Sequence, residues 1–259
     1  MKSVTINSVA EYVALVCEEN KAIKESGEKG LSLLFRGQAC CDNDLIPSIG
    51  RKTQAGKALI EEERNMIEMA KYKLPTVFSR DLTPIELLAL LQHHGIPTRL
   101  LDVSENALVG LYFACHDDKM SVGKDAEVIV FKSNDSDVAN YPRVNAICES
   151  YKNTDNAGED TAGKEDDDII FVYAPSYSLR QNIQRGRYIL FKDSLEEGKR
   201  RIKPIPKDHK SIVLRIKVPD SAKKQIRKDL RLLGVSKELL FLDNSDMVCK
   251  EIAERFSER

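Results

Sequence analysis

The 259-residue sequence lacks several features that would assign it to a specialised class of protein. No apolar run approaches the roughly 20 residues that a membrane-spanning helix needs. The first residues are interrupted by Asn7, Ser8 and Glu11, which is not the pattern of a secretory signal. No internal repeat is visible. We therefore expect a cytoplasmic protein that has no membrane partner.

The paired Cys-x-x-Cys spacing that builds many zinc sites is also missing. We expect reduced thiols at all six cysteines, which are Cys17, Cys40, Cys41, Cys115, Cys148 and Cys249. An acidic run ends at Asp166, Asp167 and Asp168, and we interpret it as a solvent-exposed loop rather than a metal site. The sequence predicts no bound metal.

The charge of the chain is small in total but unevenly distributed. The net charge is −1, yet residues 180–259 carry +9 and the rest of the chain −10. Such asymmetry is compatible with a contact to nucleic acid or to an acidic partner. The alternative is that the two parts fold together and compensate each other. The basic residues that would contact a nucleic acid are Lys199, Arg200, Arg201, Lys223, Lys224, Arg227 and Lys228.

The order of apolar patterns predicts an α+β fold with a central mixed or antiparallel sheet. Helices are expected over residues 7–25, 58–74, 84–94, 105–117 and 219–234, and strands over 31–37, 98–103, 126–132, 169–175, 187–192 and 211–218. We expect one domain over residues 1–259. Its core spans about 30–195, with an acidic insertion at about 150–168 and a basic C-terminal appendage at about 196–259.

Two of the predicted helices carry local signals at their ends. Thr83 and Glu86 form a capping-box pattern around a proline at the first helical position. Ser104 is expected to cap the next helix. In that helix Gly110 and Ala114 have small side chains, which permit close approach to a neighbouring backbone. The helix over residues 84–94 is apolar on most faces and should therefore be buried.

Polar residues gather at the ends of predicted elements in three stretches, FRGQ at 35–38, QHHGIPTRLLDVS at 92–104 and LRQNIQRGRY at 179–188. Arg36 follows an apolar strand, and an arginine buried there without a partner would be costly. Its partner is either a side chain, Asp102 or Glu63, or the phosphate of a ligand. His93 lies at a helix end whose dipole favours the imidazolium. It is then either a helix-end residue or an acid/base group.

The three stretches together resemble the FRG domain family, which is named for its (Phe/Tyr)-Arg-Gly motif. LLALLQHHGIPTRLLDVSENALVGLYFA is similar to the family's Gln-His-x-Gly-x-Pro-Thr-Arg-Leu-Leu-Asp block and the small-residue helix that follows it. NIQRGRYILF looks like the family's Gln-x-Gly-x-(Phe/Tyr) element. Val103 departs from the pattern, because members often carry an aromatic residue there. The resemblance covers roughly residues 30–245.

The order of these motifs also resembles the ADP-ribosyltransferase fold. In that fold an arginine–glycine strand engages the dinucleotide, a middle strand ends in Ser or Thr before a helix, and a late strand delivers a glutamate. This resemblance implies an NAD-utilising ADP-ribosyltransferase-like enzyme, in toxin or phage-defence settings, with NAD as substrate and a nucleic acid or protein as acceptor. It implies catalytic roles for Arg36, His93, Asp102 and Gln184. The residues expected to bind the cofactor are Gly37, Gln38, Arg51, Gln92, Thr98, Arg99, Ser104 and Gly186.

Gln184 stands where the transferase pattern has a glutamate. A glutamine keeps a hydrogen bond but not the negative charge that supports the reacting ribose, so either Asp102 supplies that charge or the site binds a nucleotide without transferring it. Three alternatives therefore stay open: a transferase, a non-catalytic module that binds nucleotide or nucleic acid, and a metal-independent nuclease that uses His93. Asp102, Thr98 and Gln184 also have purely structural interpretations, as a strand-end residue, a local cap and a buried carboxamide.

Overall fold

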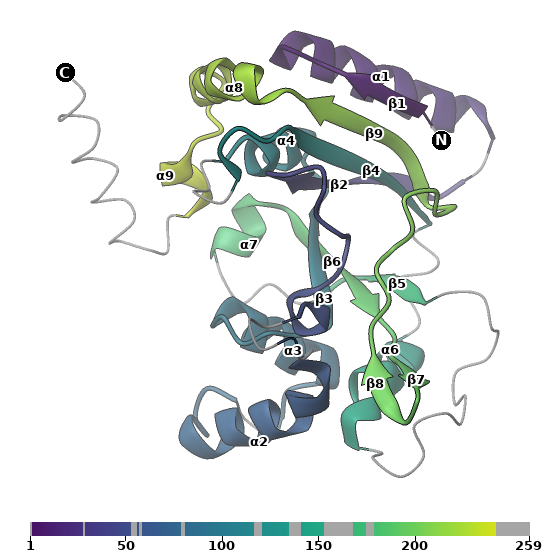
Figure 1. Cartoon of the computed structure of the whole chain (residues 1–259), viewed down its shortest axis with the longest axis vertical. Helices are drawn as coiled ribbons and strands as arrows, with labels where there is room; N and C mark the ends of the chain where they lie inside the picture. Colours follow the sequence, from purple (N-terminus) through teal and green to yellow (C-terminus); the bar gives the residue numbers. More distant parts are fainter. Residues whose placement is uncertain are drawn as a thin grey trace.

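The structure is a computed structural model that describes residues 2–27, 29–52, 56, 59–78, 81–116, 121–134, 141–152, 168–174 and 179–241. It has an α+β architecture built on one seven-stranded mixed sheet, as the sequence predicts (Figure 1). The strand order is β1-β9-β4-β2-β3-β6-β5, and only the β1–β9 pair is parallel within the described residues. A separate hairpin joins β7 and β8. Within these residues, no helix is both long and apolar enough to cross a membrane.

The strands are β1 (Lys2–Thr5), β2 (Leu31–Gln38), β3 (Leu100–Ser104), β4 (Ala126–Asn134), β5 (Ile169–Val172), β6 (Gly186–Phe191), β7 (Ser194–Glu196), β8 (Lys199–Arg201) and β9 (Ile212–Val218). The α-helices are α1 (Val9–Glu25), α2 (Glu63–Lys73), α3 (Pro84–His93), α4 (Ala107–Cys115), α6 (Tyr141–Cys148), α7 (Leu179–Ile183), α8 (Asp220–Leu232) and α9 (Lys237–Leu240). Three 3-10 turns are η1 (Ser48–Gly50), η2 (Leu59–Glu62) and η4 (Ser150–Lys152).

Alternation along the strands sends side chains to two faces of the sheet. On one face, α1, α4 and α8 cover the half formed by β1, β9, β4 and β2, and α2, α3 and α6 cover the half formed by β3, β6 and β5 (Figure 1). We call the first cluster the upper core and the second the lower core. The opposite face is covered by irregular segments that carry Leu45, Ile49, Ile60, Ile202 and Ile205. The seam between the two helical groups therefore lies over β2 and β3.

The segment expected as a basic C-terminal appendage supplies four elements of this architecture, β8, β9, α8 and α9. β9 lies between β1 and β4 in the sheet, and α8 packs on the upper core through Ala222, Ile226 and Leu230. Six short helices and strands were not predicted: β1, which pairs in parallel with β9, the hairpin strands β7 and β8, and the helices α6, α7 and α9. The acidic residues 153–167 and the segment 242–259 lie outside the described residues.

Local signals explain the helix that precedes the seam and the one that follows it. At α3 the capping box between Thr83 and Glu86 is formed, as predicted, with Glu86 accepting from the Thr83 backbone N–H at 2.7 Å. At α4 the prediction was wrong by two residues, because Asn106 is the N-cap and its side chain accepts from Leu108 N at 3.0 Å. Ser104 instead accepts a hydrogen bond from Asn106 N in the turn before the helix.

Candidate functional site

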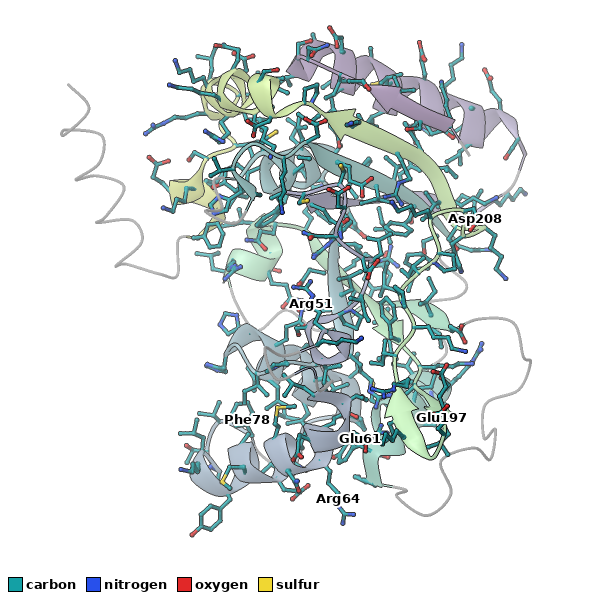
Figure 2. All side chains as sticks on the ribbon, viewed as in Figure 1. Arg51, Glu61, Arg64, Phe78, Glu197 and Asp208 are labelled. Atoms are coloured by element: carbon teal, nitrogen blue, oxygen red, sulfur yellow. The ribbon has the colours of Figure 1, made fainter. Side chains whose placement is uncertain are left out.

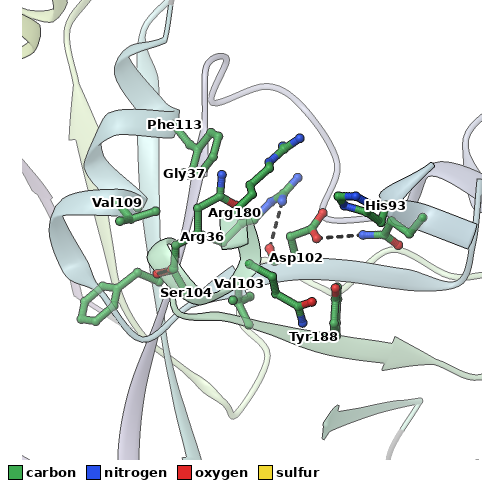
Figure 3. A pocket seen from close by; sticks show the side chains of 16 residues that line it. Arg36, Gly37, His93, Asp102, Val103, Ser104, Val109, Phe113, Arg180 and Tyr188 are labelled. Atoms are coloured by element: carbon green, nitrogen blue, oxygen red, sulfur yellow. Dashed lines mark hydrogen bonds between the residues drawn. The ribbon is translucent and has the colours of Figure 1, made fainter. Parts of the chain in front are cut away.

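A pocket of about 260 Å³ lies at the seam between the two helical groups (Figure 3). Its walls come from β2, the end of α3, β3, α4, α7 and the start of β6. The lining residues are Phe35, Arg36, Gly37, Gln92, His93, Asp102, Val103, Ser104, Val109, Gly110, Phe113, Arg180, Gln181, Gln184, Gly186 and Tyr188. All four residues expected to be catalytic are among them, as are four of the eight expected to bind a cofactor.

The pocket exists because two neighbouring strands separate. Within the described residues β2 and β3 are paired at one position, Phe35 opposite Ser104, whereas β2 is paired with β4 along its whole length. Helix α4 lies directly over this point. A Cβ on Gly37 would come within 2.0 Å of the Gly110 carbonyl oxygen, and a Cβ on Gly110 within 2.7 Å of the Phe35 Cβ. The close approach expected from small residues is therefore real, and packing alone requires glycine at position 37.

Arg36 extends across the gap between the separated strands. Its Nη1 donates to the main-chain carbonyl of Asp102 at 2.9 Å, and its Nε is buried without a hydrogen-bond partner among the described residues (Figure 3). Burial lowers the pKa of the Arg36 guanidinium, the charge of Asp102 opposes this shift, and the charge of Arg51 adds to it. An arginine nevertheless keeps its charge at neutral pH. The site therefore presents a fixed cation with unused donor capacity.

Asp102 is held by a chain of side-chain hydrogen bonds. Thr98 Oγ1 donates to Gln92 Oε1 at 2.5 Å. Gln92 Nε2 in turn donates to Asp102 Oδ1 at 2.8 Å, and Figure 3 shows this second hydrogen bond. Thr98 is buried, and its oxygen also accepts from the Leu100 backbone N–H. Thr98 thus does not line the pocket but fixes the carboxamide that orients the Asp102 carboxylate. One oxygen of Asp102 is engaged in this way, and the side chain remains exposed toward the pocket.

Gln184 lies in the turn between α7 and β6. Its main-chain carbonyl accepts from Ser104 Oγ at 2.6 Å, and its Nε2 donates to the Leu240 carbonyl at 3.0 Å. The Ser104 hydroxyl therefore fastens the end of β3 to the turn that carries Gln184. The side chain of Gln184 is in part a structural bridge to α9, although it also lines the pocket.

Eight of the sixteen lining residues were not among the predicted site residues, and the polar or aromatic ones at the pocket wall include Phe113, Arg180, Gln181 and Tyr188. Tyr188 pairs with Asp102 across β3 and β6, so the two side chains lie on the same face of the sheet. Burial and the neighbouring Asp102 charge raise the pKa of the Tyr188 phenol far above its ordinary value. It is therefore a neutral hydrogen-bond donor at any physiological pH. Strand pairing would have identified it, because the sequence had already predicted both strands.

Arg99, which was expected to bind the cofactor, is fully buried and is not among the residues that line the pocket. Its guanidinium donates to both carboxylate oxygens of Glu63, with Nε at 2.8 Å from Oε1, and to Asp193 at 2.9 Å. Arg200 binds the same two carboxylates, at 3.0 Å and 2.6 Å. Two cations and two anions thus form a closed buried network. Glu63 is accordingly not the partner of Arg36, which removes one interpretation left open by the sequence.

Two further residues expected at the cofactor lie outside the pocket lining. Gln38 is buried, and its Nε2 donates to the Asp44 carbonyl at 3.3 Å. Arg51 is exposed and donates to the Ile46 carbonyl at 3.4 Å (Figure 2). His93 is an exposed residue of the pocket rim, and its ring contacts that of His94 edge to face.

Among the described residues no cluster of His, Cys, Asp and Glu has the form of a metal site. Asp166 and Asp167 lie outside them.

The basic residues considered for nucleic-acid binding do not form one solvated face. Lys223 is buried and donates to the carbonyls of Ala39 and Lys124, at 2.9 and 2.6 Å. Arg227 donates to the Cys115 carbonyl at 2.7 Å, and Arg200 belongs to the buried network. These three cations are used within the fold, which weakens the case for a continuous phosphate-binding surface.

Comparison with known proteins gives one match. No curated protein and no solved structure matches the chain. A family model does match, over a segment that begins in β2 and ends just after α4. This segment contains Arg36, Asp102 and the hydrogen-bonded chain that orients the carboxylate. This segment, residues 32–122, matches the family model of the FRG domain.

Proposed function

We propose that the pocket binds an NAD-type dinucleotide and breaks the bond between nicotinamide and ribose, as an ADP-ribosyltransferase-like enzyme does. The observation that carries the proposal is the arrangement of three neighbouring strands. β2, β3 and β6 lie side by side and bring Arg36, Ser104 and Gln184 to one pocket. This is the order of motifs that resembles the transferase pattern. A cation with unused donors, a carboxylate and a neutral phenol then converge on the same space.

The reaction makes specific electrostatic demands. When the C1′–N1 bond breaks, its electron pair leaves with nicotinamide, and positive charge develops on the ribose ring. The acceptor nucleophile then forms a bond to C1′ and loses its proton. A carboxylate close to the ribose stabilises this transition state, and such a group contributes about 2–3 kcal/mol, or roughly a hundredfold in rate. We assign this role to Asp102, because Gln184 has no charge.

The other pocket residues have complementary roles in this proposal. Arg36 binds phosphate oxygens through its planar donors. Tyr188, fixed beside Asp102, donates a hydrogen bond to the nicotinamide carboxamide or to a ribose hydroxyl. Gln92 and Thr98 keep the Asp102 carboxylate in one orientation, which preserves its electrostatic effect without reorganisation during the reaction. His93 lies at the rim, where the acceptor would approach.

Incubation of the pure protein with NAD tests the proposal, with released nicotinamide measured by mass analysis. We expect release by the parent protein and a loss of about a hundredfold for Asp102→Asn. Arg36→Lys keeps the charge but removes the bidentate geometry, and it should raise KM. Asp208→Asn is the matched control, because Asp208 is an exposed carboxylate in the loop before β9 (Figure 2). Binding of NAD with no release, unaffected by Asp102→Asn, would leave only a nucleotide-binding module.

A further inference from the structure

The pocket wall formed by helix α7 has few stabilising contacts of its own. Helix α7 has five residues and none of them is buried, although Arg180 and Gln181 from this helix line the pocket. A single helical turn is unstable in isolation, because nucleation costs more than one turn of hydrogen bonds returns. The position of α7 must therefore depend on contacts from other elements.

Two such contacts come from the end of α9. The Arg180 guanidinium lies over the Phe241 ring, 4.4 Å from its centroid. The Gln184 side chain donates to the Leu240 carbonyl at 3.0 Å. Leu240 and Phe241 are only 1% and 8% exposed and belong to the upper core, where the Phe241 ring also contacts Phe113. The end of α9 is thus anchored firmly enough to fix a weakly supported neighbour.

The main chain after α7 has a second, independent anchor. Ser104 Oγ donates to the Gln184 carbonyl, and the Glu105 N–H donates to the Arg185 carbonyl at 3.0 Å. Loss of the α9 contacts would therefore free the Arg180 end of the helix more than the Gln184 end. Stacking on Phe241 also leaves the donors at the edge of the Arg180 guanidinium available to an anion. Arg180 can consequently serve as a second phosphate ligand beside Arg36.

We propose that Arg180 binds the diphosphate of a dinucleotide and that Leu240 and Phe241 are the positioning residues that hold it in the pocket. The inference rests on the proposed function for the identity of the ligand, but not for the mechanical coupling between α9 and α7. The C-terminal end of the described chain, more than 50 residues beyond Gln184, thereby sets the affinity of the pocket.

A double-mutant cycle in the full chain tests the inference. Calorimetric titration with NAD and with ADP-ribose is carried out on the parent, Phe241→Leu, Arg180→Ala and the double variant. We expect Phe241→Leu to weaken binding about three- to tenfold in the parent background and not at all when Arg180 is already alanine. Leu239→Ala is the control on the same helix, since Leu239 is 42% exposed, and it should leave affinity unchanged. An equal loss in both backgrounds would overturn the inference, because Phe241 would then act only through general packing.

Hydrogen exchange provides a measurement that needs no ligand. Amides of residues 179–185 should exchange faster in Phe241→Leu and also in Arg180→Ala, whereas those of α8 should not change. Arg180→Ala leaves the core untouched, so it answers the question even if the Phe241 variant fails to fold. Unchanged exchange in Arg180→Ala would refute the coupling. If the parent binds neither NAD nor ADP-ribose, the proposed function fails, and exchange alone then decides whether α9 positions α7.

Discussion

The buried network around Arg99 makes the free energy of unfolding depend on pH. The size of this dependence follows from the pKa shift of one member, Asp193. Asp193 accepts from Arg99 Nη1 at 2.9 Å and from Arg200 Nε at 2.6 Å, and its side chain is 11% exposed. Burial alone would raise the pKa of Asp193, but the two guanidinium groups outweigh it and lower the pKa from 3.8 to about 2. The perturbation that we consider is Asp193→Asn, which keeps the shape and removes the charge.

The sign of the effect follows from proton uptake. The folded pKa lies below the unfolded pKa, so the unfolded chain binds the proton first as the pH falls. The stabilisation is therefore complete above the unfolded value of 3.8 and is lost as the pH falls through about 2. A difference of this size corresponds to about 2 kcal/mol at neutral pH, and about 1 kcal/mol of it should already be lost at pH 3.

Urea unfolding followed by circular dichroism at pH 7, 5, 4 and 3 measures this contribution. We expect Asp193→Asn to lower the free energy of unfolding by at least about 2 kcal/mol at pH 7, because Arg99 and Arg200 lose a charged acceptor. The gap between the two proteins should narrow as the pH falls below 4. Asp208→Asn should follow the parent throughout. A gap that is constant or widens toward pH 3 would show that the Asp193 charge is not stabilised in the folded state.

Three further predictions concern the pocket. Gly37→Ala places a Cβ 2.0 Å from a carbonyl oxygen of α4, so we expect it to cost about 3 kcal/mol or more in urea unfolding. A Cβ at position 186 would lie 3.3 Å from the Gln181 Cγ and 3.6 Å from the Gln181 carbonyl oxygen, so Gly186→Ala should cost far less. Thr98→Val removes the hydroxyl that fixes the Gln92 carboxamide, so kcat for NAD should fall about tenfold while KM changes little. An unchanged kcat would mean that the Asp102 carboxylate does not need this support. A glutamate at position 184 cannot donate to the Leu240 carbonyl, so Gln184→Glu should lower NAD turnover and speed amide exchange in α7. Increased turnover would instead mean that a carboxylate at this position restores a missing catalytic charge.

The sequence predicted the helices and strands best where the spacing of apolar residues agrees with the capping residues and glycines at the ends of the element. The helix that begins at Thr83, the apolar strands and the mixed sheet follow from alternation, capping and glycine placement. What the sequence could not supply was strand order, because the neighbours of β3 are far from it in the chain. The four expected catalytic residues meet in one pocket only because β2, β3 and β6 are adjacent. The short helix α7 has no apolar period to reveal it, since none of its residues is buried.

The predicted site residues that lie outside the pocket lining have a common physical feature. Sequence identifies a polar residue near the end of an element but does not say which polar atoms are already used. Arg99 and Gln38 were expected in the pocket, yet each spends its donors inside the fold, on carboxylates in one case and on a carbonyl in the other. The basic C-terminal residues show the same feature. Lys223 was considered as a contact to nucleic acid, although it is buried and donates to two carbonyl oxygens within the fold.

The strand β3 and the residues just before it divide the central motif into two sets with different tasks. Arg99 stabilises the fold, because it neutralises two buried carboxylates and leaves no donor for a ligand. Asp102, three residues later, lines the pocket, where one of its oxygens is fixed by Gln92 and the carboxylate remains exposed. The same division separates Gly37, which the packing of α4 requires, from Arg36, whose Nε is buried without a partner among the described residues. A mutation of Arg99 or Gly37 should therefore lower the free energy of unfolding. A mutation of Asp102 or Arg36 should instead lower ligand affinity or turnover and leave the fold intact. Measuring both quantities for each variant therefore separates the structural residues of the motif from those that act on the ligand.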